Sequence, residues 1–363
     1  MITRKKTREI KLGTYKIGGN APILVQSMLN TDTCDIEKTL KQIHALVDVG
    51  CEAIRLAVPT MQASRALKII CQKVSIPLIA DIHFDYRLAI ASLEAGVQGL
   101  RINPGNIGSS KNIDKVVSCA KAHNAIMRIG VNSGSLEKEL YRKYGAPTPE
   151  AMVESALSHI SLLESKGYYN IKISLKSSSV LETIAAYKLL STKCDYPLHV
   201  GITEAGTLLR GATKSAVGLG ILFWEGLGDT LRVSLTSDPV QEVIVAYEIL
   251  RSLGLRRYGP EIISCPTCGR TEIDLINLAT AVEERLKTET LPIKVAVMGC
   301  VVNGPGEARH ADIGLAGGRD KGSIFCKGQV IRTVKGQDAL LLAFMEELDK
   351  LIKTKTGVDY ALE

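Results

Sequence analysis

The sequence predicts an α/β fold, a TIM (β/α)8 barrel followed by a smaller α+β domain. Eight short apolar runs rich in Ile, Val and Leu alternate with helical stretches between residues 21 and 254. Such runs are typical of parallel strands buried on both faces. The alternation stops at the polar segment 256–260, and a length of 363 residues favours two domains. We therefore expect a barrel over residues 1–255 and a second domain over residues 260–363.

The predicted barrel elements follow one another in strict order. Three of its helices are followed by Gly50, Gly96 and Gly167, where a left-handed C-cap favours glycine. Eight βα repeats over about 230 residues match the size of a TIM barrel. A doubly wound sheet with extra strands stays the alternative, because periodicity alone cannot show closure. The strands are expected at 22–27, 53–58, 77–83, 99–103, 125–131, 170–176, 197–203 and 230–236, and the helices at 36–49, 61–73, 87–95, 113–123, 149–166, 180–192, 208–219 and 239–253.

The second domain carries a different pattern. A helix is expected at 271–287, a strand at 293–298, and three short strands at 312–316, 323–326 and 330–334. An amphipathic helix at 339–353 closes the chain.

Composition limits the function classes. The chain has nine cysteines, most of them single in apolar patterns, which is typical of a reducing compartment. No apolar run reaches the roughly 18 residues that cross a bilayer, and the basic start lacks a signal-peptide core. Aromatic residues make up only 4% and no nucleic-acid motif is present. We expect a cytoplasmic protein with no membrane or nucleic-acid partner, whose net charge of +7 suits a small anion or an acidic protein.

Polar residues lie in or just after the predicted strands, and TIM barrels place their active sites at the carboxyl ends of their strands. Five of them are cations, against few acids. Any one cation alone would suggest a salt bridge, but five are costly to bury unless an anion neutralises them. Arginine forks match phosphate oxygens, so we expect a phosphorylated or diphosphorylated substrate. The set is Arg55, Asp81, His83, Arg101, Asn103, Arg128, Asn132, Lys176, Thr203, Glu204, Arg232 and Ser234.

Two turns and two titratable residues complete this picture. The turns 103–108 and 132–135 place backbone N–H groups at helix starts, a further anion-binding device. Glu204 and His83 are candidates for acid–base catalysis. The alternative is that they orient the arginines, and both interpretations stay open here.

Cys265, Cys268 and Cys300 have the spacing and the Gly/Pro-rich setting of metal ligands. A CxxC pair alone also fits zinc or a redox dithiol, but zinc favours a second close pair, and a dithiol leaves Cys300 unexplained. Three thiolates suit a [4Fe–4S] cluster whose fourth iron has another ligand. Cys326 would complete an all-cysteine site, although its apolar strand pattern favours a buried thiol. Glu307 would supply a carboxylate that a substrate oxygen can displace.

The chain resembles the family of flavodoxin-dependent 4-hydroxy-3-methylbut-2-enyl diphosphate synthases, which act in the methylerythritol phosphate route to isoprenoids. Its cysteine segments read SCPTCGR at 264–270 and MGCVVNGPGE at 298–307. Its barrel segments read ADIHF at 80–84, RINPGN at 101–106, IGVNSGS at 129–135 and HVGITEAG at 199–206. The resemblance spans essentially the whole chain, in its shorter two-domain form.

The resemblance implies reductive ring opening and dehydroxylation of 2-C-methyl-D-erythritol 2,4-cyclodiphosphate, an oxidoreductase activity. It implies a [4Fe–4S] cluster held by Cys265, Cys268, Cys300 and Glu307, with Glu307 also catalytic. It further implies reduced flavodoxin or ferredoxin as electron donor and a head-to-tail homodimer. In this setting Glu204 is the expected acid and His83 the weaker candidate.

Two other function classes are alternatives to this interpretation. A non-catalytic zinc or iron–sulfur sensor on a barrel scaffold leaves the five cations unexplained. A pterin- or phosphosugar-binding barrel enzyme would make the cysteine domain structural, and its activity would survive Cys300→Ala.

Overall fold

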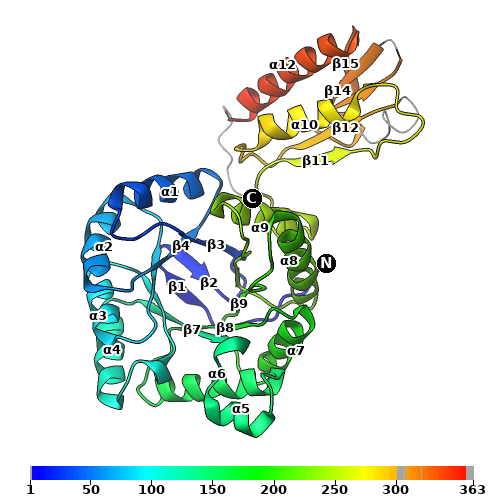
Figure 1. Ribbon diagram of the computed structural model, residues 1–363. Coiled ribbons are helices and arrows are strands. Elements are labelled where there is room, and N and C mark those ends of the chain that lie inside the picture. The colour runs from blue at the N-terminus through cyan, green and yellow to red at the C-terminus, as the bar shows by residue number, and fades with distance from the viewer. Residues whose placement is uncertain (1, 301–305, 307–308, 320, 357–363) are drawn as a thin grey trace. The chain divides into compact units, whose positions relative to one another are not determined.

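The computed structural model describes residues 2–300, 306, 309–319 and 321–356. The chain forms two compact units, residues 1–256 and 257–363 (Figure 1). Glu307 lies outside the described residues. None of the described helices combines the length and apolar character that a membrane span requires.

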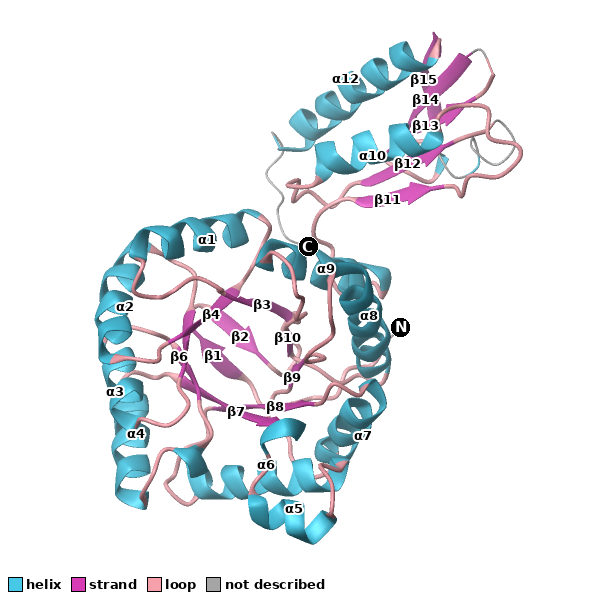
Figure 2. Cartoon of the chain, in the orientation of Figure 1, coloured by secondary structure: helices cyan, strands magenta, loops and turns pink. Residues whose placement is uncertain are grey.

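The first unit is a parallel barrel of eight strands, ringed by helices (Figure 2). Hydrogen-bonded neighbours follow the order β8-β7-β6-β5-β4-β3-β10-β9. A parallel bridge between Ile173 and Leu198 brings β8 and β9 together, so the sheet curls around on itself. This confirms the predicted barrel over the doubly wound sheet. The strands are β3 (Leu24–Met28), β4 (Ala53–Ala57), β5 (Leu78–Asp81), β6 (Gly99–Arg101), β7 (Ile126–Asn132), β8 (Ile171–Lys176), β9 (His199–Val200) and β10 (Thr230–Leu231).

The eight predicted barrel helices are all present, and the described residues add one short α-helix and two 3-10 turns, at Pro104–Asn106 and Ser133–Ser135. Polar N-caps start several of them: the Asp35 side chain accepts from Lys38 N at the first helix. Gly50, Gly96 and Gly167 have φ of 88°, 106° and 64°, the left-handed caps expected of them. The helices are α1 (Ile36–Asp48), α2 (Met61–Lys73), α3 (Tyr86–Glu94), α4 (Ser110–Ala122), α5 (Lys138–Tyr144), α6 (Pro149–Glu164), α7 (Val180–Ser191), α8 (Leu208–Trp224) and α9 (Pro239–Ser252).

An antiparallel hairpin of β1 (Ile10–Leu12) and β2 (Tyr15–Ile17) precedes the barrel. Its buried Leu12 and Ile17 form one apolar cluster with Leu24, Ile79 and Ile126 at the starts of barrel strands. Sequence analysis missed this hairpin because its strands are only three residues long. The hairpin therefore packs its apolar residues against the end of the barrel where these strands begin.

The described residues of the second unit form a five-stranded mixed sheet with two helices packed on it. The strand order is β11-β12-β13-β14-β15, with the first three parallel and the last three antiparallel. Leu278 and Val282 of one helix and Phe344 and Leu348 of the other share a core with the sheet. The elements are β11 (Glu261–Ser264), α10 (Leu275–Leu286), β12 (Lys294–Met298), β13 (Ile313–Gly317), β14 (Lys321–Cys326), β15 (Gln329–Lys335) and α12 (Gln337–Thr356), of which only β11 was not predicted.

Candidate active site and cysteine site

Of the five cations singled out in the sequence, Arg101 and Lys176 end β6 and β8 and Arg232 directly follows β10. Arg55 and Arg128 lie within β4 and β7. Arg128 and Lys176 are only 3% and 6% exposed, and Arg55 and Arg101 are also buried. Arg232 follows β10 and is half-buried. Arg55 and Arg101 both contact Asp81, and Arg55 and Arg232 both contact Met28. Arg128 is the register partner of Arg101, and Lys176 lies near enough to Arg128 and Arg232 for their charges to act on it, so the five charges share one mouth.

Asp81 is the counter-ion at one side of this mouth. Its Oδ1 lies 3.4 Å from Arg101 Nη1 and its Oδ2 lies 3.8 Å from Arg55 Nε. Burial by itself would raise the pKa of the Asp81 carboxyl. The contact with His83 and the charges of Arg55 and Arg101 outweigh burial and lower this pKa, so Asp81 is an anion.

Glu242 is the counter-ion at the other side. It is a buried residue of α9 whose two carboxylate oxygens accept from Arg232 Nε and Nη2 at 3.1 and 3.0 Å. The same carboxylate accepts from Ser27 Oγ and from Leu235 N, both at 3.0 Å. This bidentate geometry orients the Arg232 fork.

Met28, the last residue of β3, lies between two arginines. Its thioether sulfur accepts from Arg55 Nε and Nη2 at 3.1 and 2.8 Å and from Arg232 Nη1 at 3.6 Å. A thioether is a weak acceptor. It therefore holds both guanidinium groups in place without neutralising them.

Arg128 and Lys176 have no ion-pair or hydrogen-bond partner among the described residues. Burial, reinforced by neighbouring arginines, lowers the pKa of both groups well below its ordinary value. Burial likewise lowers the pKa of Arg55 to about 10, although Asp81 partly offsets it. A bound anion would remove this electrostatic cost.

Two glycines leave room for the charged groups. A Cβ on Gly130 would lie 3.2 Å from Arg101 Nε and 3.6 Å from Nη2 of both Arg101 and Arg128. A Cβ on Gly201 would lie 3.1 Å from Lys176 Nζ and 2.4 Å from the Arg232 carbonyl oxygen. Neither position can take a side chain without displacing a cation or the backbone.

Side chains of neighbouring elements hold the two loops that were predicted to bind anions. Asn103 Oδ1 accepts from Gly130 N at 3.0 Å and fixes the first loop to β7. The buried His159 of α6 lies under Gly105, where a Cβ would be 2.9 Å from its Cε1. Its Nε2 lies 3.0 Å from Oε1 of Glu137, just after the second loop. The His159 contact lowers the pKa of Glu137 to about 2.

The two acid–base candidates have different surroundings. The side chain of His83 is 57% exposed, and Arg101 Nη1 donates to its Nδ1 at 3.1 Å. Glu204 is exposed on the loop after β9, has a left-handed φ of 52°, and has no side-chain partner in the described part of the chain. Such a backbone conformation is costly for a residue other than glycine and is often found at functional sites. Thr203, Ser234 and Asn132 lie beside these loops, half-buried.

Sequence analysis missed Met28 and Glu242. Met28 gives no signal, because an apolar residue at a strand end is expected in any barrel. Glu242 does give one, since it interrupts the otherwise apolar inner face of α9 near Val243 and Ala246.

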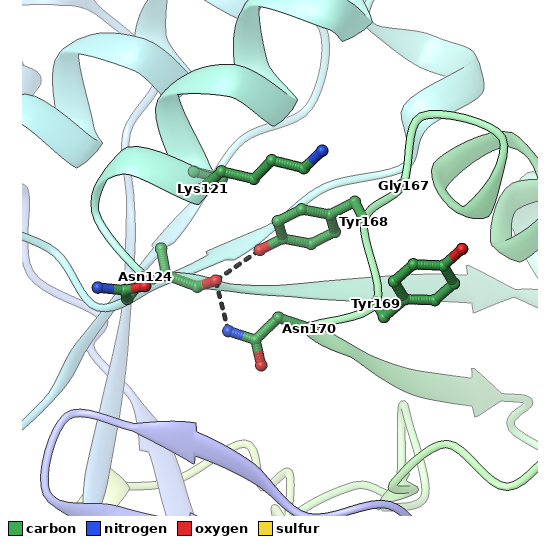
Figure 3. Close-up of a pocket in the computed structure, with 8 residues that line it drawn as sticks. Lys121, Asn124, Gly167, Tyr168, Tyr169 and Asn170 are labelled. Carbon is green, nitrogen blue, oxygen red and sulfur yellow. Dashed lines mark hydrogen bonds between the residues drawn. The ribbon is translucent and has the colours of Figure 1, made fainter.

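A separate shallow pocket lies at the opposite end of the strands (Figure 3). Its lining includes Asn124, Tyr168 and Asn170, next to the starts of β7 and β8. Tyr168 Oη and Asn170 Nδ2 both donate to the Ala125 carbonyl, at 2.5 and 2.8 Å. These contacts fasten the strand starts together, so we assign the pocket a structural role.

In the second unit, the cysteine loops follow the adjacent parallel strands β11 and β12. Gly299 N donates to Cys265 Sγ at 3.2 Å, and Glu272 N donates to the Gly299 carbonyl at 3.0 Å. A Cβ on Gly299 would meet the Thr271 methyl at 2.9 Å. The CxxC loop and the loop that carries Cys300 are thus in direct contact.

The donor chemistry of these loops fits a thiolate-bound cluster. The Arg270 backbone N–H, aided by the Arg270 charge, lowers the pKa of the Cys268 thiol. Backbone N–H groups that point at cysteine sulfurs are typical of cluster sites. Within the described residues, however, no three His, Cys, Asp or Glu side chains gather around one point.

The alternative ligand Cys326 lies at the wrong end of the sheet. It pairs with Ile313, which pairs with Val295. Cys300 comes five residues after Val295, a distance of about 16 Å along a strand direction. Cys326 cannot join Cys265 and Cys300 at one cluster.

The structure thus defines a two-domain protein: a TIM barrel with a cationic mouth and a mixed-sheet domain with thiols after adjacent strand ends. The chain belongs to the GcpE family, whose TIM-barrel domain model matches residues 7–247 and whose C-terminal domain model matches residues 261–350.

Curated relatives extend over nearly the whole chain. One from Lawsonia intracellularis is 67% identical over 97% of this chain and 98% of its own length. Relatives from Maridesulfovibrio salexigens and Caldanaerobacter subterraneus are 66% and 61% identical, over 98% and 96% of this chain and 100% and 98% of their own lengths. All three are named 4-hydroxy-3-methylbut-2-en-1-yl diphosphate synthase (flavodoxin). The predicted family is confirmed.

A solved dihydropteroate synthase from Stenotrophomonas maltophilia matches 68% of this chain and 98% of its own, with a TM-score of 0.52 and 13% identity. At this identity the likeness supports the barrel fold alone.

Proposed function

We propose that this chain converts 2-C-methyl-D-erythritol 2,4-cyclodiphosphate into 4-hydroxy-3-methylbut-2-en-1-yl diphosphate. The overall change consumes two electrons and two protons and releases one water. The names of relatives at 55–67% identity support this activity. The observation that carries it is the barrel mouth, where Arg128 and Lys176 are buried without a partner among the described residues.

The diphosphate binds among the cations of the mouth. On one side, the guanidinium groups of Arg55 and Arg232 are held by Met28 and Glu242. On the other, the guanidinium groups of Arg101 and Arg128 lie next to Gly130. Opening of the ring breaks a C–O bond and leaves the electrons on a phosphate oxygen. Fixed cations stabilise this charge as it develops. The set of substrate-binding residues is completed by Asp81, Asn103, Asn132, Lys176, Thr203 and Ser234.

Glu204 supplies a proton to the hydroxyl oxygen that leaves as water. Its carboxyl has no partner among the described residues and lies on a loop at the barrel mouth, which suits an acid that must approach the substrate. His83 has the weaker position, because a guanidinium can only donate and its bond from Arg101 therefore occupies an imidazole nitrogen. We assign His83 to the orientation of Arg101.

Cys265, Cys268 and Cys300 hold a [4Fe–4S] cluster, with Glu307 as the fourth ligand. The contact between the two cysteine loops and the Gly299 N–H on Cys265 support this assignment. When bound, the cluster supplies electrons one at a time. Reduced flavodoxin is the donor we propose, after the names of the relatives, with ferredoxin as the alternative. We further propose a head-to-tail homodimer, in which the cluster domain of one subunit closes over the barrel of the other.

The test is anaerobic reconstitution of the full chain with iron and sulfide, followed by absorption and EPR spectra with and without the cyclic diphosphate. We expect a brown protein whose reduced EPR signal changes when the substrate is added. Turnover with reduced flavodoxin should then yield the linear diphosphate. A protein that binds no iron, or a cluster indifferent to the substrate, would overturn the proposal.

A further inference from the structure

Lys172 is a buried lysine that the proposed reaction does not use. It lies on β8 and is 0% exposed. Its register partner on β7 is Arg128, so it stands next to the cationic mouth. A lysine is almost never fully buried unless it is paired.

The partners of Lys172 are weak. Its Nζ donates to Oε1 of the buried Gln26 on β3 at 3.5 Å, the upper limit of a hydrogen bond. The Gln26 amide nitrogen has no partner among the described residues. No carboxylate of the described chain forms an ion pair with Lys172, so its charge would be buried without compensation.

The charged groups around Lys172 are mostly cations. Arg55 faces it from β4 and Arg128 from β7, and Lys176 lies farther along its own strand. His199 of β9 is also near, but burial and these cations lower its pKa well below the ordinary value, so it is neutral. The one nearby acid is Asp229, just before β10. Its carboxylate is already engaged by Arg4, Thr7 and the Leu198 N–H, at 3.0, 3.0 and 2.9 Å. Burial first, and then Arg128 and Arg55, lower the pKa of Lys172 to about 7.

We propose that Lys172 is a positioning residue that takes up a proton from solvent when the diphosphate binds in the mouth, and so adds a positive charge to the site only in the complex. This inference rests on the proposed function, which supplies the anion. An anion near a buried lysine favours its charged form. By linkage, the protonated lysine strengthens anion binding by the same factor.

The cyclic diphosphate itself exchanges no proton near neutral pH. Each of its phosphorus atoms carries an ester and an anhydride link and keeps one strongly acidic oxygen. Any proton that is taken up when the cyclic diphosphate binds is therefore taken up by the protein.

The experiment is isothermal titration of the full reconstituted chain with the cyclic diphosphate, in two buffers of different ionisation enthalpy at about pH 8. A lysine moving from a pKa of about 7 toward its ordinary value of about 10.4 takes up most of one proton at this pH. Lys176, whose pKa is also lowered, adds to the uptake in every variant that keeps it. We expect the uptake of Lys172→Met to be smaller than that of the wild type by most of one proton, and that of Lys193→Met, an exposed lysine, to equal the wild type. Above about pH 7 the proton taken up by Lys172 should make the wild-type affinity fall by up to tenfold per pH unit more steeply than that of Lys172→Met.

The outcomes are distinguishable. Binding by Lys172→Met with the wild-type proton uptake would overturn this inference alone. A wild-type chain that binds no cyclic diphosphate would overturn the proposed function and the inference together. If Lys172→Met does not fold, as judged by circular dichroism, Lys172→Gln provides the same comparison.

Discussion

Glu242, on the inner face of α9, accepts hydrogen bonds from Arg232 with both carboxylate oxygens: Nη2 donates at 3.0 Å and Nε at 3.1 Å. Arg128, in the same mouth, has no such partner in the described chain. One arginine is therefore oriented by the protein, whereas the other is buried without a partner among the described residues. This contrast predicts opposite effects of substitution on the stability of the two sites.

Arg128→Met should weaken binding of the cyclic diphosphate and stabilise the ligand-free protein. Loss of a charge-assisted contact lowers affinity by roughly tenfold to a hundredfold, since such bonds contribute about 1.5–3 kcal/mol. Removal of an uncompensated buried charge should add about 1 kcal/mol of stability. Calorimetric titration and denaturant unfolding measure the two effects. Arg65→Met on the exposed face of α2 is the control, and a less stable Arg128→Met protein would contradict the expectation.

Glu242→Ala should destabilise the fold and weaken binding together. It leaves Arg232 without its buried partner, and breaking a buried ion pair costs about 3–5 kcal/mol. Denaturant unfolding gives the stability change, and steady-state kinetics should show a raised KM. Glu248→Ala, on the exposed side of the same helix, should change neither by much. Unchanged KM in Glu242→Ala would mean that Arg232 does not contact substrate.

Glu204→Gln should bind substrate and turn it over slowly. A general acid contributes roughly 100- to 10,000-fold to a rate, and glutamine keeps the shape without the proton. Titration calorimetry should show nearly unchanged affinity while kcat falls by at least about 100-fold. Near-normal turnover in Glu204→Gln would reject Glu204 as the acid and return His83 to that role.

Substitution of the proposed ligand cysteines should remove bound iron, whereas substitution of Cys326 should not. Cys265→Ser and Cys300→Ser should each lose most of the iron that the reconstituted wild type holds, because a cluster with only two cysteine thiolates left is poorly bound. Cys326→Ser is the matched control, since Cys326 lies at the opposite end of the sheet. Iron and sulfide assays with visible absorption measure the result. Loss of the cluster in Cys326→Ser would contradict the assignment.

The stability of the ligand-free protein should depend on pH through Lys172. The folded-state pKa of about 7 lies below the unfolded value of about 10.4, so the unfolded chain binds more protons between them. The cost of burying Lys172 is therefore fully present below about pH 7 and fades as the pH rises through this window. Below pH 7, Lys172→Met should be more stable than the wild type by on the order of a few kcal/mol, and the two should converge toward about pH 10. Denaturant unfolding across this range tests it, and a pH-independent difference would count against Lys172 as the titrating group.

Much of the fold was predictable from local pattern. Buried parallel strands must be apolar along their whole length, and helices begin at caps such as Asp35 and end at glycines such as Gly50. The hairpin β1–β2 escaped prediction because strands of three residues carry too little periodicity. The five cations could be found for the same reason, since a charge interrupts an apolar run.

Sequence by itself determined the alternation that builds the barrel, the family motifs and the cysteine segments. Only the tertiary structure decided which cation has a partner: Arg232 meets Glu242, whereas Arg128 meets none among the described residues. It also decided that Cys326 lies away from Cys265, and that Lys172 is enclosed beside Arg128. Strand alternation is set by each residue and its chain neighbours. Pairing, burial and electrostatic cost depend on distances between residues far apart in the chain, which only the closed barrel and the sheet register define.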